Sequence, residues 1–151
     1  MQKTRKNLKS TSIVVLALAG LSFISLVFEI FFGDLKEMLK TAPIPEGAPA
    51  NIVLITQIIV LAVAILLLLP NIYIGVKGIK LAKNPDKSKA HIIWGIFVTV
   101  CTVLSLGAPI TALLQSTGST FGNIAEICSI AVDIMILFEY VILSINLRKQ
   151  V

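Results

Sequence analysis

The sequence predicts an all-α protein: a polytopic integral membrane protein whose four-helix transmembrane bundle has short connections. Three observations lead to this fold class. The 151 residues are 56% hydrophobic, with a mean hydropathy of +0.94. Charged residues make up 14% of the chain, whereas a soluble domain carries about 25%. The apolar residues fall into four long stretches, and the basic residues lie between some of them.

Each apolar stretch has the length of a membrane span. A bilayer core about 30 Å thick needs roughly 20 apolar residues in a helix. Backbone groups in lipid must be bonded within the segment, so each span is expected to be helical. The predicted spans are residues 13–32, 52–81, 90–109 and 124–147, and the whole chain, 1–151, is expected to form a single membrane domain.

The first span follows a basic N-terminal segment and ends before Gly33. An outer loop, residues 33–51, connects it to the second span. Asp34 and Glu37 form a capping-box pattern in this loop, which predicts a short surface helix.

The second span contains Pro70, which predicts a kink because proline removes one backbone hydrogen bond. Gly75 and Gly78 follow, and such small residues allow a neighbouring helix to approach closely. A short cytoplasmic turn, residues 82–89, then predicts that the second and third spans are antiparallel neighbours.

The third span begins at the cytoplasmic face, where His91 is expected to contact lipid headgroups. Pro109 is expected to kink or end this helix. The outer loop that follows, residues 110–123, carries no charge. The fourth span leads into a cytoplasmic tail, residues 148–151.

Basic residues predict the orientation of the chain. The N-terminal segment, the segment 77–89 and the C-terminal tail hold eleven of the thirteen basic residues and share one side. That side is expected to be cytoplasmic, because positive charge marks the inner face. We expect a plasma-membrane protein, and the lack of eukaryotic signals favours a bacterial one. The residues expected to contact anionic headgroups are Lys77, Lys80, Lys83, Lys87 and Lys89.

Four carboxylates lie within the predicted spans. Glu29 and Glu126 lie near outer ends, within reach of headgroups or water. Asp133 lies near the middle of the fourth span, and Glu139 is about 6–8 Å closer to the cytoplasm. An acid at the bilayer centre costs about 2.5–3.5 kcal/mol, so both deep acids are expected to face protein or a water-filled cavity.

Two interpretations of the deep acids stay open. Either they are neutral and hydrogen-bond hydroxyls or amides between helices, or they bind a cation or relay protons. Ala125, Ser129 and Asp133 are spaced by four, and this row is predicted to pack against another helix.

The chemistry-bearing residues favour a protein that is not an enzyme. Neither a metal-ligand set nor a nucleotide-binding motif is present, so no metal and no cofactor are expected. The expected partners are the anionic bilayer and a second copy or a larger membrane complex, without nucleic acid. An accessory or scaffold protein acting through helix–helix contacts is favoured. The alternative is an oligomeric proton-coupled or cation transporter or channel that uses Asp133 and Glu139.

Overall fold

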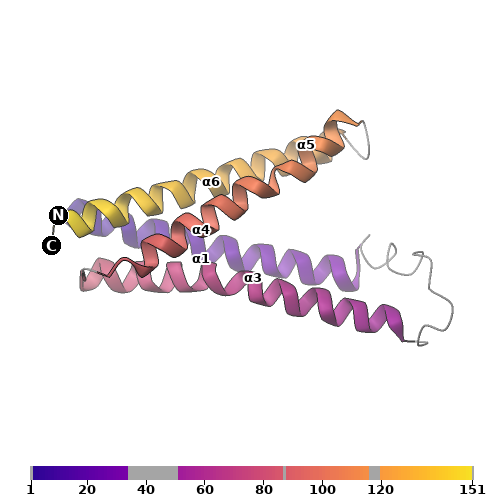
Figure 1. Ribbon diagram of the computed structural model, residues 1–151, viewed down its shortest axis with the longest axis horizontal. Helices are drawn as coiled ribbons and strands as arrows, with labels where there is room; N and C mark the ends of the chain where they lie inside the picture. The colour runs from indigo at the N-terminus through magenta and orange to yellow at the C-terminus, as the bar shows by residue number, and fades with distance from the viewer. Residues whose placement is uncertain (1, 34–50, 87, 116–119, 151) are drawn as a thin grey trace. The chain divides into compact units, whose positions relative to one another are not determined.

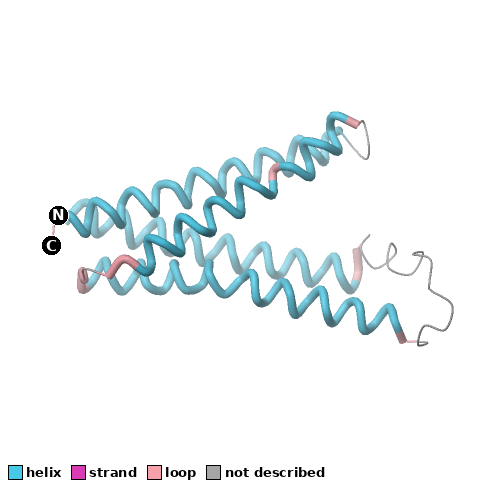
Figure 2. Tube along the Cα trace, viewed as in Figure 1, coloured by secondary structure: helices cyan, strands magenta, loops and turns pink. Residues whose placement is uncertain are grey.

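The computed structural model describes residues 2–33, 51–86, 88–115 and 120–150, and this part of the chain is all-helical. The helices are α1 (Gln2–Phe31), α3 (Ile52–Lys83), α4 (Ala90–Ser105), α5 (Gly107–Leu114) and α6 (Thr120–Lys149) (Figure 1, Figure 2). Four segments are long and apolar enough to cross a membrane: α1, α3, α4 with α5, and α6. The all-helical architecture with four such segments is therefore confirmed.

α1 begins at Gln2, well before the apolar run that starts at residue 13. The N-terminal lysines, arginine and leucine are good helix formers. Leu8 and Ser12 are fully buried, which ties these first turns to their neighbours. The basic N-terminal residues are therefore presented by an ordered helix.

α3 runs to Lys83, two residues beyond the predicted span. Its last backbone hydrogen bond joins the amide of Asn84 to the carbonyl oxygen of Lys80, at 2.8 Å. Pro70 lies in the interior of α3, and the kink expected there stays a prediction.

The third apolar segment is interrupted near its predicted end. α4 ends at Ser105 and α5 begins at Gly107. Pro109 has no backbone amide to donate to the carbonyl oxygen of Ser105, which explains the break. α5 then continues to Leu114, so residues 110–114, which the sequence assigned to the outer loop, are helical.

α6 also extends into that expected loop, because it begins at Thr120 rather than at residue 124. The predicted fourth span lies wholly within α6. The remainder of this loop, residues 116–119, lies outside the described residues, as do residues 34–50 with the expected surface helix.

The chain packs as two compact units. The terminal unit comprises Met1–Leu18 and Pro70–Val151, and the second unit comprises Ala19–Leu69. α1 and α3 each contribute residues to both units.

In the terminal unit, α4 and α5 pack along α6, and α4 and α6 run antiparallel (Figure 1). Both chain ends and the connection between α3 and α4 lie at the same end of this unit. Four helices supply its hydrophobic core: Leu8, Val15, Ile74, Leu81, Ile92, Val98, Leu137, Tyr140, Val141 and Leu147.

In the second unit, a side-chain hydrogen bond joins α3 to α1. Nε2 of Gln57 donates to the carbonyl oxygen of Ile30 at 2.9 Å, and both residues are buried. Ile30 lies in the last turn of α1, where carbonyl groups lack partners within the helix. Gln57 therefore gives a side-chain donor to a carbonyl group in the last turn of α1.

Candidate functional site

Basic residues gather at the end of the terminal unit that holds both chain ends. All eleven basic residues that the sequence assigned to one side belong to this unit. Among the five expected headgroup lysines, Lys80, Lys83 and Lys89 are exposed, and Lys77 is half-buried. Lys87 lies outside the described residues.

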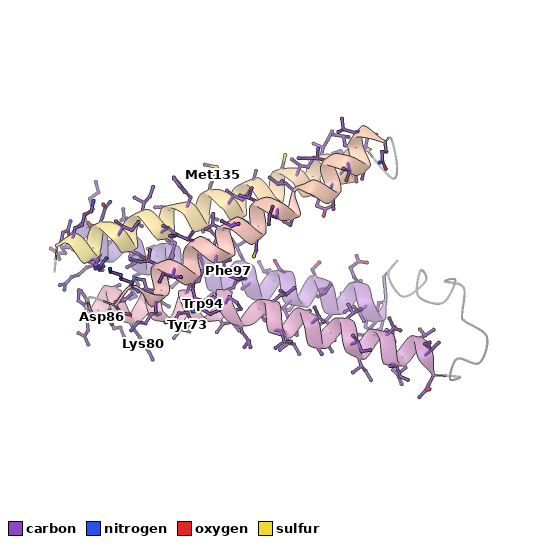
Figure 3. All side chains as sticks on the ribbon, in the orientation of Figure 1. Tyr73, Lys80, Asp86, Trp94, Phe97 and Met135 are labelled. Atoms are coloured by element: carbon purple, nitrogen blue, oxygen red, sulfur yellow. The ribbon has the colours of Figure 1, made fainter. Side chains whose placement is uncertain are left out.

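Lys77 and Asp86 form an ion pair that fixes the connection between α3 and α4. Nζ of Lys77 donates to Oδ2 of Asp86 at 2.8 Å, and the amide of Ser88 donates to Oδ1 at 2.9 Å. The hydrogen bond from Lys77 lowers the pKa of Asp86, partial burial opposes this, and the Ser88 amide adds to the lowering. Figure 3 shows Asp86 near Lys80 at this end.

Two glycines of α3 allow α1 and α6 to approach closely. A β-carbon at Gly75 would lie 2.5 Å from Cγ of Leu16 and 3.2 Å from the carbonyl oxygen of Ser12. A β-carbon at Gly78 would meet the hydroxyl of Ser12 and lie 2.7 Å from Cε2 of Tyr140. Both glycines that the sequence singled out for packing therefore contact α1. Gly78 contacts α6 as well.

Tyr140 of α6 is the residue around which three helices meet. One edge of its ring faces Gly78 of α3, and the other faces Gly95 of α4. A β-carbon at Gly95 would lie 3.2 Å from Cε1 of Tyr140 and 3.1 Å from Cγ2 of Val141. Tyr140 is fully buried as a result.

Aromatic contacts also join α3 to α4, next to the contact between Gly95 and Tyr140. The ring of Trp94 meets Tyr73 with centroids 6.5 Å apart and Phe97 with centroids 5.6 Å apart, both edge to face. Figure 3 shows the three side chains close together.

His91 is buried, although the sequence favoured a lipid-headgroup contact for it. Its side chain is 2% exposed and faces inward on α4. Nδ1 of His91, the hydroxyl of Tyr140 and the hydroxyl of Ser144 are buried, and none forms a hydrogen bond of regular geometry within the described part of the chain. Sequence reasoning did not connect these three groups, because His91 lies on α4 and the other two lie on α6.

Glu139 lines a groove between α1 and α6. The groove has a volume of about 360 Å³, and its other lining residues are Asn7, Ser10, Thr11, Val14 and Ile136. Asn7, Ser10 and Thr11 immediately precede the apolar run of α1. Glu139 therefore lies beside the part of α1 in which polar residues give way to the apolar run.

The other expected acidic residues do not converge on this groove. Glu29 and Glu126 are exposed, and Asp133 is half-buried on α6. The side chain of Glu29 folds over Gly33 at the end of α1. Ala125 and Ser129 are exposed in the structure, so the packing expected of them stays a prediction.

Four hydroxyl groups of the apolar helices, which could serve as partners for the deep acids, donate to carbonyl groups of their own helices instead. Such bonds join Thr56 to Ile52, Thr99 to Gly95, Thr102 to Val98 and Ser105 to Thr102. Within the described ranges, Asp133 and Glu139 are given no hydrogen bond by these groups. In the part of the chain that the structure describes, no group of three or more His, Cys, Asp or Glu residues could hold a metal ion.

No protein-family model, no curated protein and no solved structure matches this chain.

Proposed function

We propose that this chain is a small tetraspan protein of the plasma membrane that acts as a non-enzymatic accessory or scaffold protein. One observation carries the proposal: three basic segments far apart in sequence belong to a single packed unit, with both chain ends and the α3–α4 connection at one end. The apolar helices supply the membrane anchor, and the packed basic end supplies the surface that partners meet.

The basic end is cytoplasmic in this proposal, because positively charged segments stay on the inner side of the membrane. The groove beside Glu139 supports a boundary near Thr11 on α1 and near Tyr140 on α6. The segment from Thr120 to Tyr140 is then about 20 residues long, as a bilayer requires. The last turns of α6 then project beyond the lipid into water. There the hydrophobic effect favours the observed burial of Val141 and Leu147.

A packed basic end attracts anionic headgroups at about 1 kcal/mol for each nearby lysine or arginine. The basic side chains of α1 have fixed positions, because α1 is helical from Gln2 and Leu8 packs in the core. These fixed positions allow the basic end to select among anionic partners. Acidic segments of another membrane protein, or a second copy of the chain, would meet a constant pattern of charge.

The lipid part of the proposal is tested with the variant Lys80→Gln/Lys83→Gln, whose side chains are exposed at the end of α3. We expect anionic phosphatidylglycerol in nanodiscs to raise the melting temperature of the wild type, and to raise that of the variant less. The matched control is Lys36→Gln/Lys40→Gln, on the side predicted to be outer, which should respond like the wild type. Equal responses of all three proteins would contradict the proposal.

The scaffold part is tested by photo-crosslinking in cells from position 80. A specific membrane protein or a second copy should be captured, and the capture should weaken when Lys83 is replaced by Gln. If only lipid adducts are recovered, position 80 contacts lipid and no protein partner, and the scaffold role is rejected.

The alternative is an oligomeric proton-coupled or cation transporter or channel. The groove favours it, because it offers a carboxylate among polar side chains next to apolar Val14 and Ile136. In proteoliposomes, Asp133→Asn or Glu139→Gln should abolish proton-coupled or cation flux if the alternative holds. A scaffold shows no flux with or without these changes.

A further inference from the structure

Three polar side-chain atoms on α4 and α6 are buried in the terminal unit. They are Nδ1 of His91 and the hydroxyl oxygens of Tyr140 and Ser144, and the exposed fractions of these residues are 2%, 0% and 2%. Nδ1 of His91 has no hydrogen-bond partner among the residues that the structure describes, and the two hydroxyls, which lie close to each other, do not form a hydrogen bond of regular geometry. Buried polar atoms without partners are rare in folded proteins, because removing them from water costs free energy.

The register of the two helices places these atoms at neighbouring levels. Gly95 of α4 lies against Tyr140 of α6, and the helices are antiparallel. His91 is four residues before Gly95, and Ser144 is four residues after Tyr140, so both lie about 6 Å further toward the same end. The hydroxyl of Ser144 is close to that of Tyr140, and Arg148, one turn beyond Ser144, acts electrostatically on His91.

We propose that His91, Tyr140 and Ser144 form a buried site that binds water, which joins the three side chains across the α4–α6 contact. Two hydroxyls and one imidazole nitrogen give the two to four polar partners that a buried water molecule requires. Each hydroxyl can donate or accept, so a single water molecule can bond to all three groups. The bound water fastens α4 to α6 beside the glycine contacts.

Water fits this site better than a cation. The three groups carry no negative charge, and Lys77 and Arg148 both act on His91 as positive charges, against the one negative charge of Asp86. The site is independent of the proposed scaffold role, because it depends only on packing within the terminal unit.

Removing one hydroxyl at a time tests for the bound water, because the melting temperature is expected to change in opposite directions with and without it. If water joins the groups, Tyr140→Phe and Ser144→Ala should each lower the melting temperature by about 2–4 °C. The double variant should lose less than the sum of the two losses, because the groups share one network. If the site is dry and the groups are unbonded, either change removes an unbonded polar atom, and the melting temperature stays constant or rises. That result would overturn the proposal. A loss that comes only from a direct contact between the two hydroxyls is told apart by the His91 signals, which then do not respond to Ser144→Ala.

A matched control is Ser105→Ala, which removes an exposed hydroxyl that bonds to its own helix through the carbonyl of Thr102. Its melting temperature should stay within 1 °C of the wild type, on the order expected for a surface change.

A second measurement does not depend on stability. His91 is the only histidine, so a protein labelled with ¹⁵N-histidine gives one set of imidazole signals. We expect magnetisation transfer from water to the His91 ring in the wild type, and a shift of the Nδ1 resonance in Ser144→Ala but not in Ser105→Ala. Absence of transfer, together with an unchanged Nδ1 resonance in Ser144→Ala, would reject bound water.

Discussion

Gly78 of α3 faces the ring of Tyr140 on α6 so closely that a β-carbon on the glycine would lie 2.7 Å from Cε2. The same β-carbon would also meet the hydroxyl of Ser12 on α1. Ser12 and Tyr140 are both 0% exposed, so neither has free space to move into. The terminal unit therefore depends on the absence of a side chain at position 78.

Replacing glycines by alanine should destabilise the protein in a defined order. Gly78→Ala should cost about 1–3 kcal/mol through overpacking. Gly95→Ala should cost less, because its β-carbon would lie 3.1 Å from Val141 and 3.2 Å from Tyr140. Thermal unfolding in detergent, followed by size-exclusion chromatography, measures the order.

The control for this series is Gly20→Ala, because, among the residues that the structure describes, no atom beyond the adjoining backbone of α1 lies within 4 Å of a β-carbon at Gly20. Its stability should equal or exceed that of the wild type, since alanine favours a helix over glycine. Equal melting temperatures for the Gly78 and Gly20 variants would show that the close contact at Tyr140 does not exist in the protein.

Gln57→Leu should destabilise the second unit. The change removes the 2.9 Å hydrogen bond to Ile30 and leaves a carbonyl group at the end of α1 without its side-chain donor. Hydrogen bonds between helices in membranes contribute about 0.6 kcal/mol on average and up to about 1.7, so a loss in this range is expected in denaturation with sodium dodecyl sulfate.

Thr56→Val serves as the comparison for Gln57→Leu, because the hydroxyl of Thr56 bonds to Ile52 of its own helix. This neighbouring change should cost less than the change at Gln57. If Thr56→Val costs more than Gln57→Leu, the hydrogen bond between Gln57 and Ile30 does not contribute measurably to stability.

Much of the fold follows from the sequence, because a membrane span depends on local composition. Long apolar runs predict the helices directly, and Gly75 and Gly78 mark points where a neighbour comes close. The helix ends were less predictable. Residues 110–114 and 120–123 lack charge and read as a loop, yet they continue neighbouring helices.

The site was harder to predict, because it depends on the register between helices distant in sequence. Nothing near Gly95 in the chain indicates that Tyr140 lies against it. Glu139 illustrates the same point: its depth was estimated from the centre of its own helix. Its groove partners on α1, among them Asn7 and Thr11, could not be read from that helix alone.

Asp86→Asn should loosen the α3–α4 connection at neutral pH. Lys77 lowers the pKa of Asp86, so the carboxylate contributes stability above its unfolded pKa of about 3.8 and loses it as the pH falls through the lower folded value. The pair is partly exposed, with side-chain exposures of 28% and 43%, so its contribution is small.

Amide hydrogen exchange at Ser88 measures this directly, since its amide donates to Asp86. The wild type should lose protection only below about pH 4, whereas Asp86→Asn should show the lower protection already at neutral pH. Lys80→Gln, which leaves the pair intact, should behave as the wild type. Protection of Ser88 that is independent of both pH and Asp86 would contradict the role of the ion pair.

Trp94 reports where the lipid boundary lies. It is the only tryptophan, it is 44% exposed, and it adjoins Gly95 at the level of Tyr140. The proposed boundary near Tyr140 puts Trp94 at the headgroup level, where tryptophan is enriched. Lipids brominated near the headgroup should therefore quench its fluorescence more strongly than lipids brominated near the ends of the acyl chains.

The variant Trp94→Phe/Leu104→Trp moves the single tryptophan ten residues along α4, or about 15 Å. Leu104 is 73% exposed, so lipid can reach the new side chain. The deep bromines should now quench more strongly than the shallow ones, because position 104 lies near the middle of the α4–α5 segment. If the two proteins are quenched alike by both lipids, the boundary does not lie at Tyr140, and the groove at Glu139 would have to be placed at a different depth.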